Sequence, residues 1–357
     1  MDLFETPDKV KVVAEAGACN GDVAYAIEAA SQAKQALCWG FKVQMYRAEK
    51  LVLPDAARYD SLGGKATTQY EMFKKAIPYH HWDRVKHHCD EIGLVFFASV
   101  FDETAFHVAE SMELPLYKVA SGDITHRPLI ELIAASGKPM IVSTGGSTFR
   151  EIGNAANWIS KASPHGVRHP VVWMACTLCY PTANDDANLS RIPMLKKQGA
   201  GLVGYSDHTI PTETGALAVA LGADVLEKHF TITPKQGGDH DFALPPGRMQ
   251  HYVSMANKAR KMRGDGELKP MPVELQGIRG ARRSLVAAVD IPKGTKIAPE
   301  MVVVLRPGGG LSPSELRRIT GTEKNSTRGA DRAMVDIPAG TQITAAMVGR
   351  VGGTLSV

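Results

Sequence analysis

Short hydrophobic segments recur along the first 230 residues, each preceded by a polar or amphipathic stretch. Each segment is about eight residues long, rich in Val, Ile and Phe, and hydrophobic at nearly every position, which is typical of strands buried on both faces of a parallel sheet. We therefore predict one buried strand in each segment. They lie within residues 10–17, 39–46, 92–100, 114–121, 138–145, 170–177, 201–208 and 223–230.

Amphipathic stretches lie between these segments and predict helices. Examples are residues 103–112, 127–136 and 212–222. Eight strands that alternate with helices are typical of an α/β protein built as a (β/α)8 TIM barrel. A further helix near residues 246–263 is expected to close the barrel, so we place the barrel domain at residues 1–263.

The pattern changes after the barrel. Residues 264–281 begin with a stretch rich in Gly, Pro and charged residues, which indicates a linker. Residues 289–302 then return as residues 335–348, with nine of the fourteen positions identical. Because the repeat occurs once, it predicts a small domain folded from two similar halves and not a solenoid. We expect this mostly β domain to span residues 282–357.

Polar side chains gather at the carboxyl ends of the predicted strands. Active sites of (β/α)8 barrels are built at that end, from residues that follow several different strands. We therefore expect these side chains to share one site. They are Glu15, Lys42, Gln44, Ser99, Lys118, Ser121, Ser143, Thr177, Asp207, His208 and His229.

Two histidines stand at the ends of consecutive strands. His208 and His229 are 21 residues apart, and neighbouring barrel strands bring such side chains within reach of one divalent cation. Two imidazoles leave coordination positions open for substrate and water, as a Lewis-acid catalyst requires. Asp207 and Glu227 nearby favour this interpretation. The alternative is a pair of histidines that form hydrogen bonds with the backbone.

Lysines and hydroxyls at the same end of the barrel predict an anion site. A phosphate or carboxylate needs charge-assisted donors from several sides, which Lys42 and Lys118 can supply together with neighbouring serines. Alternatively, both lysines pair with carboxylates. Glu15 is a candidate general base toward water; a structural role as an acceptor for backbone amides is the other interpretation.

Two further groups resemble functional motifs but carry less weight. His80, His81, His87 and His88 fall in one predicted helix, where surface histidines are more common than metal ligands. Cys176 and Cys179 form a C-x-x-C sequence without a second pair, so it supports neither a zinc ribbon nor a redox site.

Composition narrows the class of protein. The chain is 44% hydrophobic and 22% charged, as soluble globular proteins are, and no apolar run approaches the ~18 residues of a membrane span. Five scattered cysteines and an acidic N-terminus without a signal peptide predict a reducing, cytoplasmic compartment. The net charge of +4 is too small for a nucleic-acid footprint. The excess of Lys and Arg over Asp and Glu lies beyond residue 263. These basic residues either help cover an anion site or are an incidental feature of the surface.

Several motifs resemble one known family. GYSDHT at residues 204–209, followed by EKHFT at residues 227–231, is the most specific pair. Other matching segments are AEAG, FKVQMYRAEKL, KVASGDITHRPLIELIAASGKPMIVSTGG, CTLCYP, GGDHDFAL, ARRSLVAAVDIPKGT and LRPGGGLSP. Along nearly its whole length the chain resembles the N-acetylneuraminate (sialic acid) synthases. Those proteins join a barrel to a C-terminal antifreeze-like (SAF) domain.

The resemblance implies a reaction and a role for each residue. Phosphoenolpyruvate condenses with the aldehyde of an N-acetylmannosamine-like sugar, which gives a 2-keto-3-deoxy sugar acid and phosphate. Lys42, Ser99, Lys118, Ser121 and Ser143 would bind phosphoenolpyruvate, and Glu15 would activate water. His208 and His229 would hold Mn²⁺, Mg²⁺ or Co²⁺. Contacts with the acceptor sugar would come from Gln44, Leu178, Tyr180, Ser206 and Asp239, and from Arg306 of the partner subunit in a domain-swapped homodimer.

Two departures from the family affect the acceptor side. The loop from Gly17 to Gly21 lacks one residue and a histidine, and Leu178 replaces a polar residue that many relatives carry. A different, less polar aldehyde is therefore an alternative acceptor. Two further alternatives are a Schiff-base aldolase that uses Lys118 or Lys42, and a non-enzymatic role in which the C-terminal domain binds ice.

Overall fold

The computed structural model describes residues 9–17, 19, 21–58, 68–164, 170–199, 201–234, 238–324 and 329–349. The chain divides into two compact units, residues 1–265 and residues 266–357. The finer division into barrel, linker and C-terminal domain at residues 263 and 281 stays a prediction.

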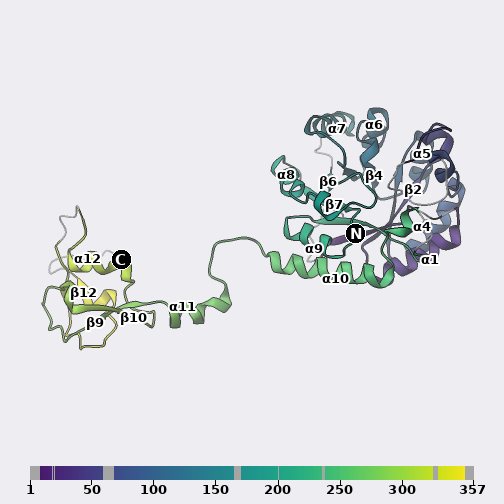
Figure 1. Ribbon diagram of the computed structural model, residues 1–357. Helices are drawn as coiled ribbons and strands as arrows, with labels where there is room; N and C mark the ends of the chain where they lie inside the picture. The colour runs from purple at the N-terminus through teal and green to yellow at the C-terminus, as the bar shows by residue number, and fades with distance from the viewer. Residues whose placement is uncertain are drawn as a thin grey trace. The chain divides into compact units, whose positions relative to one another are not determined.

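The first unit is a closed barrel of parallel strands surrounded by helices (Figure 1). Each strand pairs with the next one in the chain, and β8 pairs with β1 so that Glu15 stands opposite His229. The predicted (β/α)8 barrel is therefore confirmed. Its strands are β1 (Lys11–Glu15), β2 (Gly40–Met45), β3 (Val95–Val100), β4 (Tyr117–Val119), β5 (Met140–Ser143), β6 (Val171–Cys176), β7 (Leu202–Asp207) and β8 (Val225–His229).

Helices follow the strands and cover the outside of the barrel. Their starts carry local signals: Asp22 and Asp102 cap α1 and α5 with side-chain hydrogen bonds, and Thr148 forms a capping box with Glu151 at α7. The helices are α1 (Val23–Gln35), α4 (Trp82–Glu91), α5 (Glu103–Ser111), α6 (Arg127–Ala135), α7 (Phe149–Ala162), α8 (Arg191–Lys197), α9 (Glu213–Ala220) and α10 (Pro246–Arg263), with short α2 (Ala48–Leu51) and α3 (Gln69–Phe73) after β2.

Side-chain alternation along the strands separates a packed interior from a polar end. Side chains at every second position of a strand point into the barrel. The interior positions nearer the amino ends are apolar and form one buried cluster, and the next inward positions are polar. This change from apolar to polar occurs from Val13 to Glu15, Phe97 to Ser99, Leu116 to Lys118, Ile141 to Ser143 and Val225 to Glu227.

The second unit is small and built from short strands. Strands β9 (Ser284–Ala287) and β10 (Val302–Leu305) are antiparallel, as are β11 (Arg332–Ala333) and β12 (Val348–Gly349). The two copies of the repeat face each other across the core. Ile291 of the first copy bridges Ile337 of the second, and both are buried with Ile297 and Ile343. The prediction of a domain made of two similar halves agrees with this pairing.

Two details differ from the sequence predictions. The predicted linker contains a helix, α11 (Leu275–Ala281), and a second helix, α12 (Leu316–Thr320), packs within the unit. The four neighbouring histidines do not share one helix, because His80 and His81 lie in the 3₁₀ turn η1 (Tyr79–His81) before α4 begins at Trp82. Among the described residues, no helix is both long and apolar enough to cross a membrane.

Candidate active site

Glu15 stands at the centre of the polar end of the barrel. The carboxylate ends β1 and is only 1% exposed. Its Oε1 accepts hydrogen bonds from Lys42 Nζ at 3.2 Å and from Gln44 Nε2 at 2.9 Å. Its Oε2 accepts one from the backbone N–H of Gly17 at 2.9 Å. Glu15 therefore accepts a backbone N–H, as a structural carboxylate would, and also faces the site, as a general base must.

A second buried carboxylate joins the two lysines. Glu227 Oε1 lies 3.3 Å from Lys118 Nζ and 3.5 Å from Lys42 Nζ. It also accepts a hydrogen bond from Ser206 at 3.4 Å, while Lys42 donates to Ser99 at 3.1 Å. Both lysines therefore pair with carboxylates, as the alternative interpretation stated. The same pairing fixes two cations side by side, one from β2 and one from β4.

The charges of this cluster shift the pKa values of its members. Burial raises the pKa of Glu227, but Lys118 and Lys42 outweigh it and lower that pKa to about 2. Burial lowers the pKa of Lys42, yet Glu15 and Glu227 raise it above its ordinary value. The pKa of Lys118 is lowered, because burial and the neighbouring Lys42 outweigh Glu227. Glu227 therefore stays negatively charged between Lys42 and Lys118.

Two serines complete the wall on the side of β4 and β5. Ser121 begins the 3₁₀ turn η2 (Ser121–Asp123), and its Oγ accepts a hydrogen bond from the backbone N–H of Gly145 at 3.1 Å. Ser143 ends β5, and its buried Oγ has no hydrogen-bond partner among the described residues. A buried hydroxyl without a partner is costly unless a ligand supplies one. Both hydroxyls therefore suit an anion held beside Lys118.

His208 is oriented by the backbone. Its Nδ1 donates a hydrogen bond to the carbonyl of Thr177 at 2.8 Å, which leaves Nε2 with the lone pair that a metal requires. Burial, followed by the charge of His229, lowers the pKa of His208 to about 3, so the ring is neutral at ordinary pH. The ring of Tyr180 packs against it at a centroid distance of 4.1 Å.

His229 lies between two carboxylates. Its Nδ1 is 3.0 Å from Glu15 Oε2 and 3.3 Å from Asp239 Oδ2. Burial lowers the pKa of His229, but Glu15 and Asp239 together raise it above the ordinary value. The ring centroids of His229 and His208 are 5.3 Å apart. The structure thus brings the two predicted metal-binding histidines together.

Donor atoms around His229 fit a divalent cation. One atom each from Glu15, His229 and Asp239 lies within 4.8 Å of the others. Glu15 and His229 are buried and Asp239 is half-buried, and imidazole and carboxylate donors of this kind suit divalent first-row metals. Glu15 was expected to activate water, and Asp239 was expected to contact the acceptor sugar. Asp239 lies in the 3₁₀ turn η5 (Gly238–Asp241), which follows β8 in the chain.

Gly17 is required where the chain leaves β1. A Cβ at this position would lie 2.5 Å from Asp239 Oδ2, 2.7 Å from Gln44 Nε2 and 3.1 Å from Glu15 Oε2. No side chain fits in that space without moving these groups. The loop that follows was predicted to differ from the family, but Ala18 and Asn20 lie outside the described residues.

Residues predicted to bind the acceptor lie in both units. Tyr180 packs on His208, as described, and also approaches Phe242 at 5.9 Å between ring centroids. Leu178 is 48% exposed and does not point into the barrel wall. A Cβ at Gly146 would touch its side chain at 3.6 Å, so Leu178 lies over the loop that follows β5. Arg306 is exposed and belongs to the second unit.

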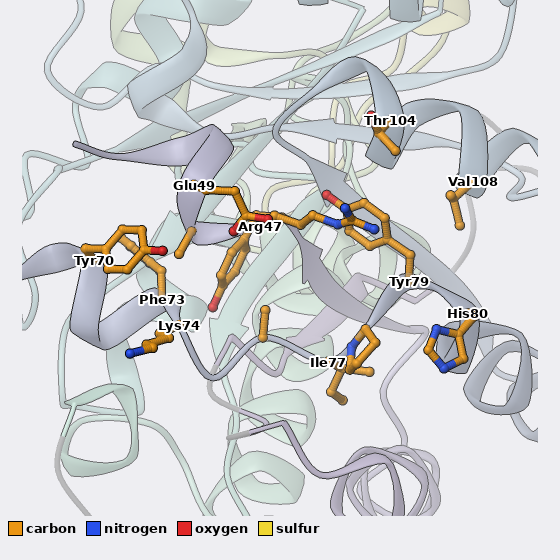
Figure 2. A pocket seen from close by; sticks show the side chains of 14 residues that line it. Arg47, Glu49, Tyr70, Phe73, Lys74, Ile77, Tyr79, His80, Thr104 and Val108 are labelled. Atoms are coloured by element: carbon orange, nitrogen blue, oxygen red, sulfur yellow. The ribbon is translucent and has the colours of Figure 1, made fainter. Parts of the chain in front are cut away.

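A pocket of about 550 Å³ opens beside the carboxyl end of β2 (Figure 2). Figure 2 shows Arg47 extending across the pocket toward Tyr79, and its guanidinium carbon lies 4.9 Å from the centre of that ring. Tyr79 in turn donates a hydrogen bond to Asp102 at 2.9 Å. Tyr46, two residues after Gln44, forms part of the lining. This pocket was not expected from the sequence.

Asp207 falls outside the centre, and the C-x-x-C sequence divides between two environments. Asp207 points away from the barrel interior and pairs with Lys228 at 3.1 Å. Cys176 Sγ lies 3.7 Å from His208 Nδ1, whereas Cys179 is exposed, so the two sulfurs of the C-x-x-C sequence have different surroundings. All five cysteines are free thiols.

Comparison with known proteins identifies the family. The NeuB family profile matches residues 27–268, and the SAF domain profile matches residues 282–349. The chain is 34% identical over 308 residues to an uncharacterized protein of Methanocaldococcus jannaschii, which covers 85% of this chain and 87% of that protein. It is 32% identical over 339 residues to the N,N'-diacetyllegionaminic acid synthase of Legionella pneumophila, with coverage of 93% and 92%.

Solved structures agree with the sequence matches. The crystal structure of N-acetylneuraminic acid (sialic acid) synthetase from Leptospira borgpetersenii, in complex with citrate, superimposes with a TM-score of 0.68. The two sequences are 29% identical, and the match covers 76% of this chain and 90% of that one. Profile, sequence and fold therefore point to the same group of enzymes. This chain belongs to the NeuB family of phosphoenolpyruvate-dependent, sialic acid synthase-like enzymes, and it carries an SAF domain at its C-terminal end.

Proposed function

We propose that this enzyme condenses phosphoenolpyruvate with an aldehyde sugar and releases phosphate, with a divalent metal held by His208 and His229. The observation that carries the proposal is the pair of buried lysines. Lys42 and Lys118 are fixed side by side by Glu227 at the end of the barrel where Ser99, Ser121 and Ser143 also gather. A dianionic phosphate and a carboxylate in one small substrate need such a concentration of donors.

The chain's own residues account for substrate binding. Lys42 and Lys118 would neutralise the phosphate and carboxylate, and the unpartnered hydroxyl of Ser143 would donate to one of their oxygens. Glu227 then stays between the lysines and holds their ammonium groups apart. A metal bound at the two histidines would act as a Lewis acid toward the aldehyde carbonyl.

The proposed reaction forms one carbon–carbon bond, and at C2 it replaces the carbon–oxygen bond to phosphate with a carbon–oxygen bond from water. C3 of phosphoenolpyruvate attacks the aldehyde carbon, water adds at C2, and the C2–O bond to phosphate breaks. Glu15 would accept the proton of the attacking water, since Lys42 and Gln44 hold its carboxylate at the centre of the site. The product is a 2-keto-3-deoxy sugar acid, and phosphate leaves with both electrons of the broken bond.

We further propose that plain N-acetylmannosamine is a poor acceptor. Leu178 is half-exposed over the β5–α7 loop, where it offers an apolar surface in place of a hydrogen-bonding group. A site that lacks one polar partner favours an acceptor that lacks the matching polar group. Measuring kcat/KM for N-acetylmannosamine against deoxy and acylated analogues tests this. A clear preference for N-acetylmannosamine would show the inference to be wrong.

A domain-swapped homodimer is part of the proposal. Arg306 is exposed on the SAF unit, and in the proposed dimer it would contact the acceptor in the barrel of a partner subunit. The free thiols support the expectation that the enzyme works in a reducing, cytoplasmic compartment.

The decisive experiment is phosphate release from phosphoenolpyruvate across a panel of aldehydes, with and without Mn²⁺, Mg²⁺ or Co²⁺. We expect release only when both aldehyde and metal are present. Release with metal-free enzyme would overturn the metal assignment. Trapping of pyruvate on Lys118 or Lys42 by borohydride, without phosphate release, would instead favour a Schiff-base aldolase.

A further inference from the structure

An ion pair is buried between the barrel wall and the outer helix α10. Asp207 ends β7, Lys228 lies on β8, and the two are directly opposite in the strand register. Asp207 Oδ2 and Lys228 Nζ are 3.1 Å apart, with side chains 0% and 1% exposed. Because side chains alternate along a strand, both point outward while their neighbours Ser206 and Glu227 point into the barrel. The pair therefore does not touch the substrate site.

Further hydrogen bonds surround this pair. Tyr252 of α10 donates to Asp207 Oδ2 at 3.0 Å. Asp207 Oδ1 accepts from the backbone N–H of Thr209 at 2.9 Å and from its hydroxyl at 2.7 Å. Lys228 donates to the backbone carbonyl of Thr209. Thr209 is thus held at its amide, its hydroxyl and its carbonyl, directly after His208.

Stability alone does not explain these charges. Taking two ions out of water is costly, and apolar residues of similar volume often stabilise a protein as well or better. Met249 and Val253, which flank Tyr252 on α10, are also buried. The chain also places Gly215 inside α9, where a Cβ would lie 2.3 Å from the Tyr252 ring. A glycine within a helix is unfavourable, so space for this tyrosine is retained at a cost.

Each member of the pair is adjacent in sequence to one of the two histidines. Asp207 precedes His208, and Lys228 precedes His229. The ion pair ties the ends of β7 and β8 together, and Tyr252 ties both to α10. The distance between the two imidazoles depends on how these strand ends lie relative to each other. Mutation of groups that orient metal-binding side chains without touching the metal typically costs about 10–100-fold in metal affinity or activity.

We propose that Asp207, Lys228 and Tyr252 are positioning residues that set the spacing of His208 and His229 for the metal. This inference rests on the proposed function, which assigns the metal to those histidines. It predicts that the cluster can be replaced without unfolding the protein but not without weakening metal binding.

The test measures Mn²⁺ binding to the metal-free full-length protein, from the electron paramagnetic resonance signal of free Mn²⁺. The decisive variant replaces the pair with apolar residues, Asp207→Leu together with Lys228→Met. We expect this variant to stay folded with a lower Tm, because Thr209 and the Tyr252 hydroxyl lose buried hydrogen-bond partners. Its Mn²⁺ affinity should fall by about 10-fold or more. Tyr252→Phe removes one hydroxyl and keeps the ring, so we expect a smaller loss of affinity with little change in Tm.

A matched control separates positioning from general destabilisation. Ile133→Ala removes buried methyl groups from α6, away from β7 and β8. We expect a lower Tm and unchanged Mn²⁺ affinity. Wild-type affinity in the apolar double variant and in Tyr252→Phe would overturn the positioning role and leave the proposed reaction intact. Failure of the wild-type protein itself to bind Mn²⁺ would instead overturn the metal assignment.

Discussion

Replacing Gly17 with alanine should damage catalysis while leaving the fold intact. The new Cβ would stand 2.5 Å from Asp239 Oδ2, whereas ordinary contacts begin near 3.4 Å, so Asp239 or the backbone must move by about 0.9 Å. Gln44 and Glu15 are crowded in the same way, at 2.7 and 3.1 Å. The φ angle of Gly17 is not in the left-handed region, so alanine itself causes no backbone strain there.

The expected size of the effect follows from that displacement. A misplacement of about 1 Å in a site costs on the order of 100-fold in rate, which corresponds to about 2.7 kcal/mol of transition-state stabilisation. We therefore expect kcat/KM of Gly17→Ala to fall by about 100-fold. The free energy of unfolding should change by less than about 1 kcal/mol, because the added methyl group also restricts the unfolded chain.

The assay combines phosphate release with thermal unfolding. Gly153→Ala is the matched control, because Gly153 is exposed within α7 and a Cβ there meets nothing within 4 Å. We expect unchanged activity and a gain of about 0.5–1 kcal/mol in stability. Wild-type kcat/KM in Gly17→Ala, at an unchanged Tm, would refute the close packing of this turn against Glu15 and Asp239.

Three further predictions concern metal, assembly and pH. Chelation or a His208→Ala substitution should abolish turnover, with Mn²⁺ restoring only the chelated wild type; full activity in chelator would refute the metal role. Mixing Arg306→Ala with Glu15→Ala chains should recover activity through hybrid dimers, and no recovery despite confirmed subunit exchange would rule out swapping. Burial raises the pKa of Asp123 to about 6 from 3.8. Below pH ~4 the protonated carboxyl of Asp123 contributes its full stabilisation to the folded protein. This stabilisation is lost as the pH rises through ~6. Asp123→Asn should therefore be more stable than the wild type at pH 8, by at most about 3 kcal/mol, and equal pH-dependence of the two proteins in urea unfolding would contradict this.

The fold was predictable because its signals are local. Continuous hydrophobic runs mark the strands, and the change from Ile141 to Ser143 or from Val225 to Glu227 marks which end of each strand is polar. Period-two alternation follows from strand geometry alone, so no knowledge of neighbouring strands is needed. The motif pair around His208 and His229 was sufficient to indicate the family.

Partner choice at the site was decided by the tertiary structure. Nothing local in the sequence indicates that Glu227, and not another acid, joins Lys42 to Lys118, because those residues come from β8, β2 and β4. Likewise, Asp239 reaches His229 only because the chain returns over the barrel mouth after β8.

Closure of the barrel brings together the residues of the site that are farthest apart in the sequence. Glu15 and His229 stand at opposite ends of the barrel sequence, yet pairing of β1 with β8 places them 3.0 Å apart. The same alternation sends Asp207 and Lys228 outward, so two charged residues inside the most specific motifs do not face the substrate site. The sequence by itself determined the strands, their polar ends and the family. Only the closed barrel decided which charges meet, because a long-range contact depends on strand register and closure and not on the residues beside it.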